Sequence, residues 1–143
     1  MQNTTTIRAA QPAAARSVRR GAHIPDLAEL YEADVMLVTA PLAPAQAALA
    51  HAEAMALAGP RSATAQVGTP DGEPAAGALD QLALPDAPGA RAWSAYLEEV
   101  TGVFAELLGA RVVGVRQVVA DGPHCPRFHV DRVMARGVLN VLG

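Results

Sequence analysis

Several residue types are scarce or missing in this 143-residue chain, and each absence narrows the possible functions. There is no lysine, so all 11 basic residues are arginine, and the net charge is −3. One tryptophan, two tyrosines and two phenylalanines are too few for an aromatic surface on which bases stack. A nucleic-acid-binding surface also needs a basic face. We therefore expect no nucleic-acid partner.

Cysteine and long apolar runs are scarce as well. The single cysteine, Cys125, excludes an intramolecular disulfide and a zinc site built from several cysteines. No apolar run approaches the roughly 18 residues of a membrane-spanning helix, so we expect no membrane partner. Residues 1–22 carry four arginines, no acidic residue and no hydrophobic periodicity, which predicts a disordered tail.

The remaining chain predicts a single α+β domain over residues 23–143, with two main helices packed on a small antiparallel sheet. Hydrophobic residues make up 51% of the chain, but many are alanine, so the core is thin. Glycine and proline interrupt residues 61–88, which predicts a long loop with at most one helical turn near 78–82. Helices are predicted over 44–59 and 91–108 with a short one from residue 24, and strands over 34–40, 112–120, 128–133 and 136–142.

The two main helices are expected to bury different kinds of side chain. In residues 44–59 alanines, Leu49 and Met55 form an apolar stripe, and His51 is expected on the exposed face in contact with solvent. In residues 91–108 the apolar face centres on Phe104, and Gly109 supplies the C-cap. The second helix is therefore the predicted core helix.

The segment HCPRFHVD, residues 124–131, concentrates the residues with metal-binding chemistry. In an extended strand Arg127, His129 and Asp131 point to one face, because successive side chains alternate. A histidine and a carboxylate two residues apart both reach one ion, as in a 2-His-1-carboxylate iron(II) site. The spacing predicts a divalent metal, iron or zinc, bound by His129 and Asp131, with Cys125 as a further candidate ligand.

The same residues have simpler interpretations. His129 and Asp131 also suit a polar strand face in which Arg127 neutralises the carboxylate. Cys125, beside a proline and two histidines, suits either an activated thiolate or a small, partly buried residue that Pro126 holds extended. These alternatives stay open.

Arginines near the segment suggest an anionic substrate. Arg127 and Arg136, together with Arg132, have the geometry to bind a carboxylate or phosphate in bidentate fashion. A solvated arginine face is the alternative interpretation.

The segment CPRFHVDRV, residues 125–133, preceded by VVGVRQVVADGP, resembles the central block of a bacterial family, domain of unknown function 1826. The resemblance covers roughly residue 93 to the C-terminus and implies a cytoplasmic protein of unknown activity with a link to metal homeostasis. The family usually has an apolar residue, often methionine, at His124, which argues against His124 as a ligand. The family's chain also continues past Gly143, so this sequence looks like a C-terminally shortened member.

Two classes of function follow. The first is divalent-metal binding. By analogy with other metal enzymes, a full-length family member would then be a non-haem iron or zinc enzyme. A complete iron site needs a second histidine, and none follows Asp131. The second is a non-enzymatic metal-handling or protein-interaction module that binds zinc through Cys125, His129 and Asp131; a non-functional fragment is the third alternative. Enzymatic activity, substrate and reaction stay undecided.

The predicted C-terminal strand, residues 136–142, has apolar side chains on both faces. An incomplete sheet would leave this strand as an uncovered edge, which promotes association. We therefore expect self-association through this strand, with Leu139 on its apolar surface.

Overall fold

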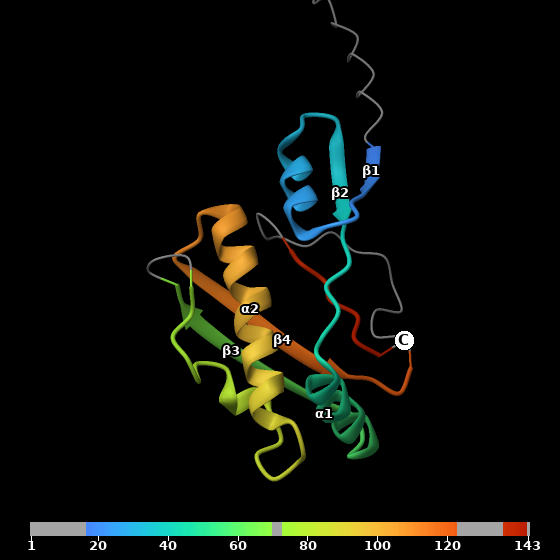
Figure 1. Cartoon of the computed structure of the whole chain (residues 1–143), viewed down its shortest axis with the longest axis vertical. Coiled ribbons are helices and arrows are strands. Elements are labelled where there is room, and N and C mark those ends of the chain that lie inside the picture. The colour runs from blue at the N-terminus through green and yellow to red at the C-terminus, as the bar shows by residue number, and fades with distance from the viewer. Residues whose placement is uncertain (1–16, 70–72, 123–135, 143) are drawn as a thin grey trace, which may run out of the picture. The chain divides into compact units, whose positions relative to one another are not determined.

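The computed structural model describes residues 17–69, 73–122 and 136–142 (Figure 1). The chain divides into two compact units, residues 1–42 and 43–143. Helices and two two-stranded sheets confirm the predicted α+β class. The predicted strand 128–133 lies outside the described residues. Within the described ranges no helix is long and apolar enough to cross a membrane.

The first unit contains a parallel pair of strands, β1 (Ser17–Arg20) and β2 (Val35–Thr39). A 3-10 helix, η1 (Ile24–Tyr31), joins them, as parallel neighbours need a crossover. The prediction of a disordered tail up to residue 22 is therefore wrong for β1. The Ser17 N–H donates to the Asp34 carbonyl at 2.6 Å, a pairing between distant segments that local sequence does not reveal.

Strand β2 confirms the strand predicted over residues 34–40, but several of its apolar side chains are exposed. Val35 is buried, whereas Met36 is 57% exposed and Leu37 is 47% exposed. A β-branched, apolar run is typical of a strand inside a larger sheet, but β2 belongs to a sheet of only two strands. Such a sheet leaves part of its apolar surface open.

Asp26 organises the start of η1. Its Oδ2 atom accepts hydrogen bonds from the N–H groups of Ala22 (2.7 Å) and His23 (3.0 Å). The bonds from His23 and Ala22 hold the pKa of Asp26 below its ordinary value, because they stabilise the charged carboxylate. A lowered pKa stabilises the folded form above the unfolded value of about 3.9, and this contribution is lost as the pH falls below it.

The second unit is built on an antiparallel hairpin of β3 (Arg61–Gly68) and β4 (Val112–Val119). Ala65 stands opposite Val115, and the alternation of side chains buries Ala65, Val67 and Val113 on one face. Strand β4 confirms the strand predicted over 112–120. Its described partner β3 lies inside the predicted loop 61–88, so that part of the loop prediction is wrong.

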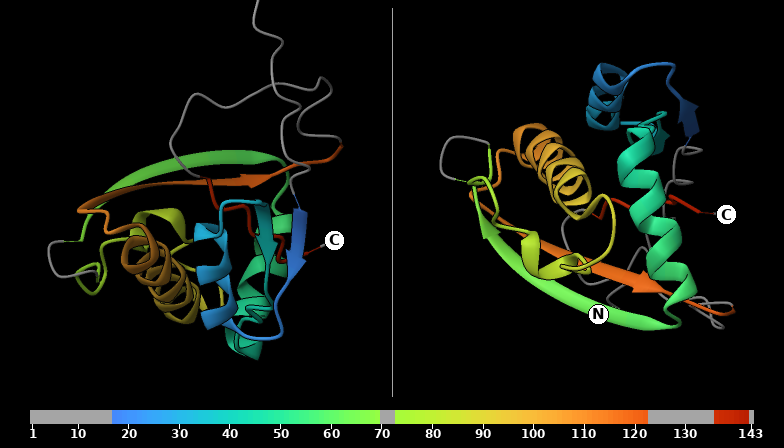
Figure 2. Two further views of the ribbon diagram at one scale, coloured as in Figure 1. Left: turned by 90° about the horizontal axis from the view of Figure 1, so that it is seen from above. Right: turned by 60° about the horizontal axis from the view of Figure 1, so that its bottom comes forward.

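Helices α1 (Gln46–Leu57) and α2 (Ala90–Leu108) confirm the two predicted main helices. Together with a 3-10 turn, η2 (Asp80–Leu82), they lie on one face of the hairpin (Figure 2). Phe104 was expected at the centre of the buried face of α2, and this prediction is only partly right, because its side chain is half-buried. The buried residues of α2 are Trp93, Ser94, Tyr96, Leu97, Thr101 and Ala105.

Residues 136–142 form no strand, so the prediction for this segment is wrong. Gly137 packs on the ring of Phe104: a Cβ placed at Gly137 would lie 3.3 Å from two ring carbons. Val138 is 81% exposed and Leu142 is 43% exposed. The segment therefore contacts α2 through a glycine and leaves larger apolar side chains in solvent.

Gly89 immediately precedes α2 and lies close to α1. It adopts φ 77°, and an added Cβ would overlap the carbonyl oxygen of Ala47 in α1. At the other end of α2, Gly109 adopts φ 58° with open space around it. Both positions have a left-handed backbone, which favours glycine. Only at Gly89 is there also no room for a side chain.

These two glycines make a matched pair of substitutions. We expect Gly109→Ala to lower the free energy of unfolding by about 1–2 kcal/mol, the cost of a left-handed non-glycine residue. Gly89→Ala should cost about 1–3 kcal/mol more, because α1 and α2 must move apart. Urea denaturation measures both values, and equal losses would show that the helices do not approach closely at Gly89.

Candidate functional site

The predicted metal-binding segment lies outside the described residues. So do its candidate ligands and neighbouring arginines: Cys125, Arg127, His129, Asp131, His124 and Arg132. Of the predicted site residues the structure describes Arg136, which is exposed at the start of segment 136–142. The metal and substrate assignments for this segment therefore stay predictions.

The described chain reaches this segment through β4 and the turn that follows it. A cavity of about 440 Å³ lies at this end of the hairpin, lined by Pro60, Arg61, Ser62 and residues 118–122. Arg116 Nε donates to Ser62 Oγ across the two strands at 3.4 Å. The chain thus leaves β4 beside a hollow whose charged lining residues are Arg61 and Asp121.

Gln117 fixes β4 against the helices. Its Oε1 accepts a hydrogen bond from Trp93 Nε1 at 2.8 Å. Its Nε2 donates to the Leu82 carbonyl at 3.0 Å and contacts the sulfur of Met55 at 3.1 Å. One amide therefore connects β4 to α2, η2 and α1, which positions the strand that leads to residues 124–131.

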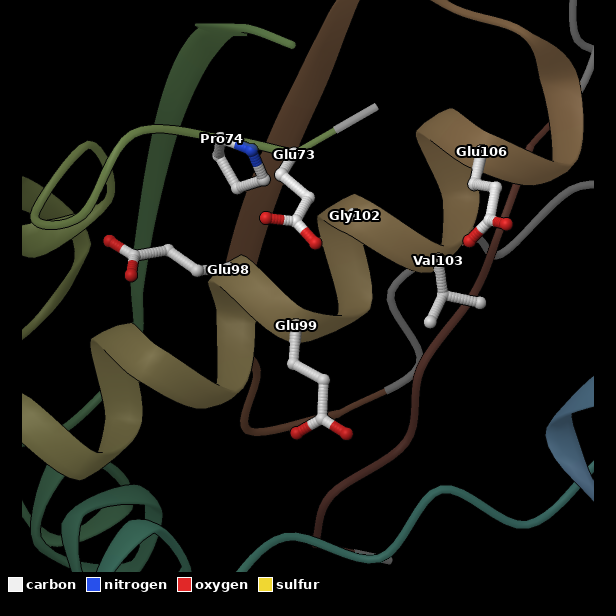
Figure 3. Close-up of a pocket in the computed structure, with 7 residues that line it drawn as sticks. All are labelled: Glu73, Pro74, Glu98, Glu99, Gly102, Val103 and Glu106. Atoms are coloured by element: carbon white, nitrogen blue, oxygen red, sulfur yellow. The ribbon is translucent and has the colours of Figure 1, made fainter. Parts of the chain in front are cut away.

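A second cavity, of about 510 Å³, lies along α2 and is acidic. Its lining residues are Glu73, Pro74, Glu98, Glu99, Gly102, Val103 and Glu106. Figure 3 shows that the carboxylates are spread along the helix, with those of Glu98 and Glu106 toward opposite ends. No group of three histidine, cysteine or acidic side chains in the described ranges is close enough to hold a metal ion. The acidic cavity is therefore not a convergent metal site.

Tyr96 is the described residue with a raised pKa. Burial is the main cause, and the negative charge of Glu99 adds to it, because both disfavour the phenolate. Its ring lies 5.9 Å from that of Trp93, centroid to centroid. Tyr96 is thus a neutral packing residue at physiological pH.

His51 was predicted to be solvated, and this prediction is wrong: the residue is 0% exposed. Its Nδ1 lies 3.0 Å from the Pro88 carbonyl oxygen, and its Nε2 accepts a hydrogen bond from the Leu84 N–H at 3.1 Å. The ring centroid lies 6.2 Å from that of Trp93. His51 therefore joins α1 to the loop that precedes α2.

The sequence contained a signal for this position. The buried residues of α1 are Ala48, His51, Ala52 and Met55, which follow the i, i+3, i+4, i+7 spacing of one helix face. The predicted apolar stripe consists of alanines, Leu49 and Met55, and it does not include His51. Spacing alone would have placed it in the core.

The sole tryptophan makes the Gln117 contact easy to test. We expect Gln117→Leu to lower the free energy of unfolding by about 1–3 kcal/mol, because the Trp93 N–H and the Leu82 carbonyl lose their partner. Gln66→Leu, on the exposed face of β3, should stay within about 0.5 kcal/mol. Denaturation followed by tryptophan fluorescence compares the two variants. Equal losses in the free energy of unfolding would contradict the role of Gln117 in holding β4 against the helices.

Comparison with known families and proteins shows to which family the chain belongs. No curated protein and no solved structure matches the chain. The family model described as "Protein of unknown function (DUF1826)" matches residues 21–141, which include nearly the whole chain and the complete segment 124–131. The chain therefore belongs to the DUF1826 family.

Proposed function

We propose that the protein binds a divalent metal ion through His129 and Asp131. The observation that carries the proposal is the His-x-Asp spacing, which suits two ligands on one strand face. The family match extends to residue 141, so the pair belongs to the family's domain. Iron(II) and zinc both accept imidazole nitrogen and carboxylate oxygen.

The surroundings of the segment support this proposal. Sites that are built on helices and strands hold their ligands more precisely than sites on loops. Strand β4 ends at Val119, five positions before His124 in the sequence, and Gln117 ties it to the helices. A segment that follows such a strand starts from a well-anchored position.

The identity of the metal separates two forms of the proposal. Iron(II) with 2-oxoglutarate-dependent turnover supports an oxygenase, for which Arg127 and Arg136 are the proposed ligands of an anionic substrate. Zinc without turnover supports a metal-handling module, in which the Cys125 thiolate is the third ligand. A cytoplasmic location is part of the proposal, since a reduced cysteine is available there.

Metal analysis of untagged protein tests the ligands. His129→Ala and Asp131→Ala should each lower the bound metal several-fold, because a ligand atom is removed. His124→Ala is the matched control in the same segment and should change the content little. Equal metal stoichiometry in all three variants would contradict the proposal. A loss of bound metal in Cys125→Ser would favour the zinc form, in which the Cys125 thiolate is a ligand.

Self-association also stays a proposal, with a changed basis. The uncovered edge of a strand no longer supports it, but residues 136–142 expose Val138 and Leu142. Contact between two copies through this segment would remove both side chains from water.

Sedimentation measurements over a range of concentrations test this contact. We expect the sedimentation coefficient of the wild-type chain to rise with concentration and that of Val138→Lys to stay constant. Leu57→Lys, at a 90% exposed position of α1, is the control and should behave as wild type. A wild-type monomer at every concentration would contradict the proposal.

A further inference from the structure

We infer that the free edge of β3 binds an extended peptide segment by strand addition, with a carboxylate of that segment on Arg116 of β4. Strand β3 pairs with β4 on one side, and among the described residues no strand pairs with its other side. Figure 2 shows β3 as the outer strand of the hairpin, with the helices over one face. An exposed sheet edge is a template for a further strand.

The register of the hairpin shows which backbone groups point to this edge. The Thr69 N–H donates to the carbonyl of Arg111 at 2.9 Å, directly beyond the paired strands. In an antiparallel pair, such bonded positions alternate with positions whose N–H and C=O groups point away from the partner. The outward positions of β3 are therefore Ser62, Thr64, Gln66 and Gly68. In the part of the chain that the structure describes, they form no backbone hydrogen bond to another element.

Strand β3 lacks the features that protect natural sheet edges. Its sequence, RSATAQVG, has no proline, and its register with β4 runs without a bulge. Charged side chains also protect edges, but the outward positions carry none. The open face has room as well, since a Cβ added at Gly68 or Gly114 would meet no atom within 4 Å. The edge therefore suits an incoming strand.

The two faces of β3 differ, and an added strand must match both. Ala65 and Val67 are buried on the face that the helices cover. Thr64 and Gln66 are exposed on the other face. Side chains alternate along a strand and interact with same-face neighbours on the next strand. The fitting segment therefore has apolar residues toward the helices and polar residues on the open face.

Arg116 determines the charge of the partner. It stands opposite Thr64, and its Nε donates to Ser62 Oγ at 3.4 Å, so the guanidinium lies over β3. A strand added beside β3 would lie about 4.8 Å from it, within reach of this side chain. Strands β3 and β4 contain no acidic residue, and within the described ranges Arg116 forms no ion pair with Asp121 or any other carboxylate. A carboxylate on the open face of the partner is therefore the complementary group.

Charge complementarity favours such a segment over a second copy of β3. Two β3 strands that pair antiparallel about Ala65 would place Thr64 of each opposite Gln66 of the other. Neither strand would bring a carboxylate to Arg116, because β3 has none. An acidic segment supplies both the backbone pairing and the opposite charge.

Amide NMR of the full chain during titration with a blocked peptide tests this inference. The probe is a short peptide of alternating threonine and valine, in which glutamate replaces a central threonine. We expect the amides of Thr64 and Gln66 to gain protection from hydrogen exchange as the peptide binds, because these N–H groups face the added strand. The amides of Ala63 and Ala65 already bond to β4 and should change little.

A second peptide, with glutamine in place of glutamate, tests the carboxylate. It should bind wild-type protein about three- to fivefold more weakly, as expected for the loss of an exposed ion pair. Arg116→Gln should bind both peptides with the same, weaker affinity. Arg91→Gln, at an exposed position of α2, is the matched control and should still distinguish the two peptides. Equal affinity of both peptides for wild type would overturn the inference.

Two further peptides, methylated at alternate amides, test backbone pairing on wild-type protein. One alternation should abolish binding and the other should preserve it, because only every second amide of a strand faces its neighbour. Binding of both methylated peptides would overturn the inference, as would protection gained at β4 in place of β3. Thr64 and Gln66 amides that are already protected without peptide would show an edge occupied within the chain or by a second copy, which would overturn it as well.

Discussion

The second unit depends on satisfying the backbone polar groups of the loop between η2 and α2. Leu82 and Ala83 are buried, and the loop forms no strand that would pair its backbone. Unpaired buried backbone groups are costly. The N–H groups of Ala83 and Ala87 donate to the carbonyls of Asp80 and Leu84, and side chains supply partners for other backbone groups. His51 of α1 bonds to the N–H of Leu84 and the carbonyl of Pro88, and Gln117 of β4 bonds to the carbonyl of Leu82. Two side chains thus hold η2 and the loop that follows it.

Other contacts of the second unit adjoin this loop. Once its end is fixed, Gly89 permits α2 to begin in contact with α1, and Trp93 reaches Gln117. The helices cover one face of the hairpin, on which Val67 and Val113 are buried. The end of β4, from which the chain continues toward residues 124–131, is positioned by the same contacts. These contacts therefore hold the strand that precedes the proposed metal-binding segment.

The sequence was sufficient to predict α1, α2 and β4. Helix α2 has a clear apolar face and β4 is an apolar, β-branched run, whereas α1 is rich in alanine, a strong helix former. The family match confirms the resemblance carried by residues 112–133. Strand β3 was missed because its sequence, RSATAQVG, is small and polar, and its pairing with β4 is a contact between distant segments. Strand β1 was missed for the same reason, since only its pairing with β2 defines it.

Single polar residues were harder to assign than whole elements. His51 has the spacing of a core residue, but its burial depends on backbone groups in a distant loop that no local pattern identifies. For the candidate site, sequence suggests ligands through the chemistry of His129 and Asp131. Spacing in one segment does not identify a ligand from another segment, because such a ligand would depend on the folded arrangement of the chain.

A double-mutant cycle between His51→Ala and Gln117→Leu tests most directly whether these two side chains hold the same loop. Urea denaturation of wild type, both single variants and the double variant at pH 7.5 gives the coupling free energy. Groups that share a structural partner typically show coupling of about 0.5–3 kcal/mol, and we expect at least about 1 kcal/mol, because loss of either contact already releases the loop. Additivity within about 0.3 kcal/mol, the behaviour of independent sites, would contradict the account.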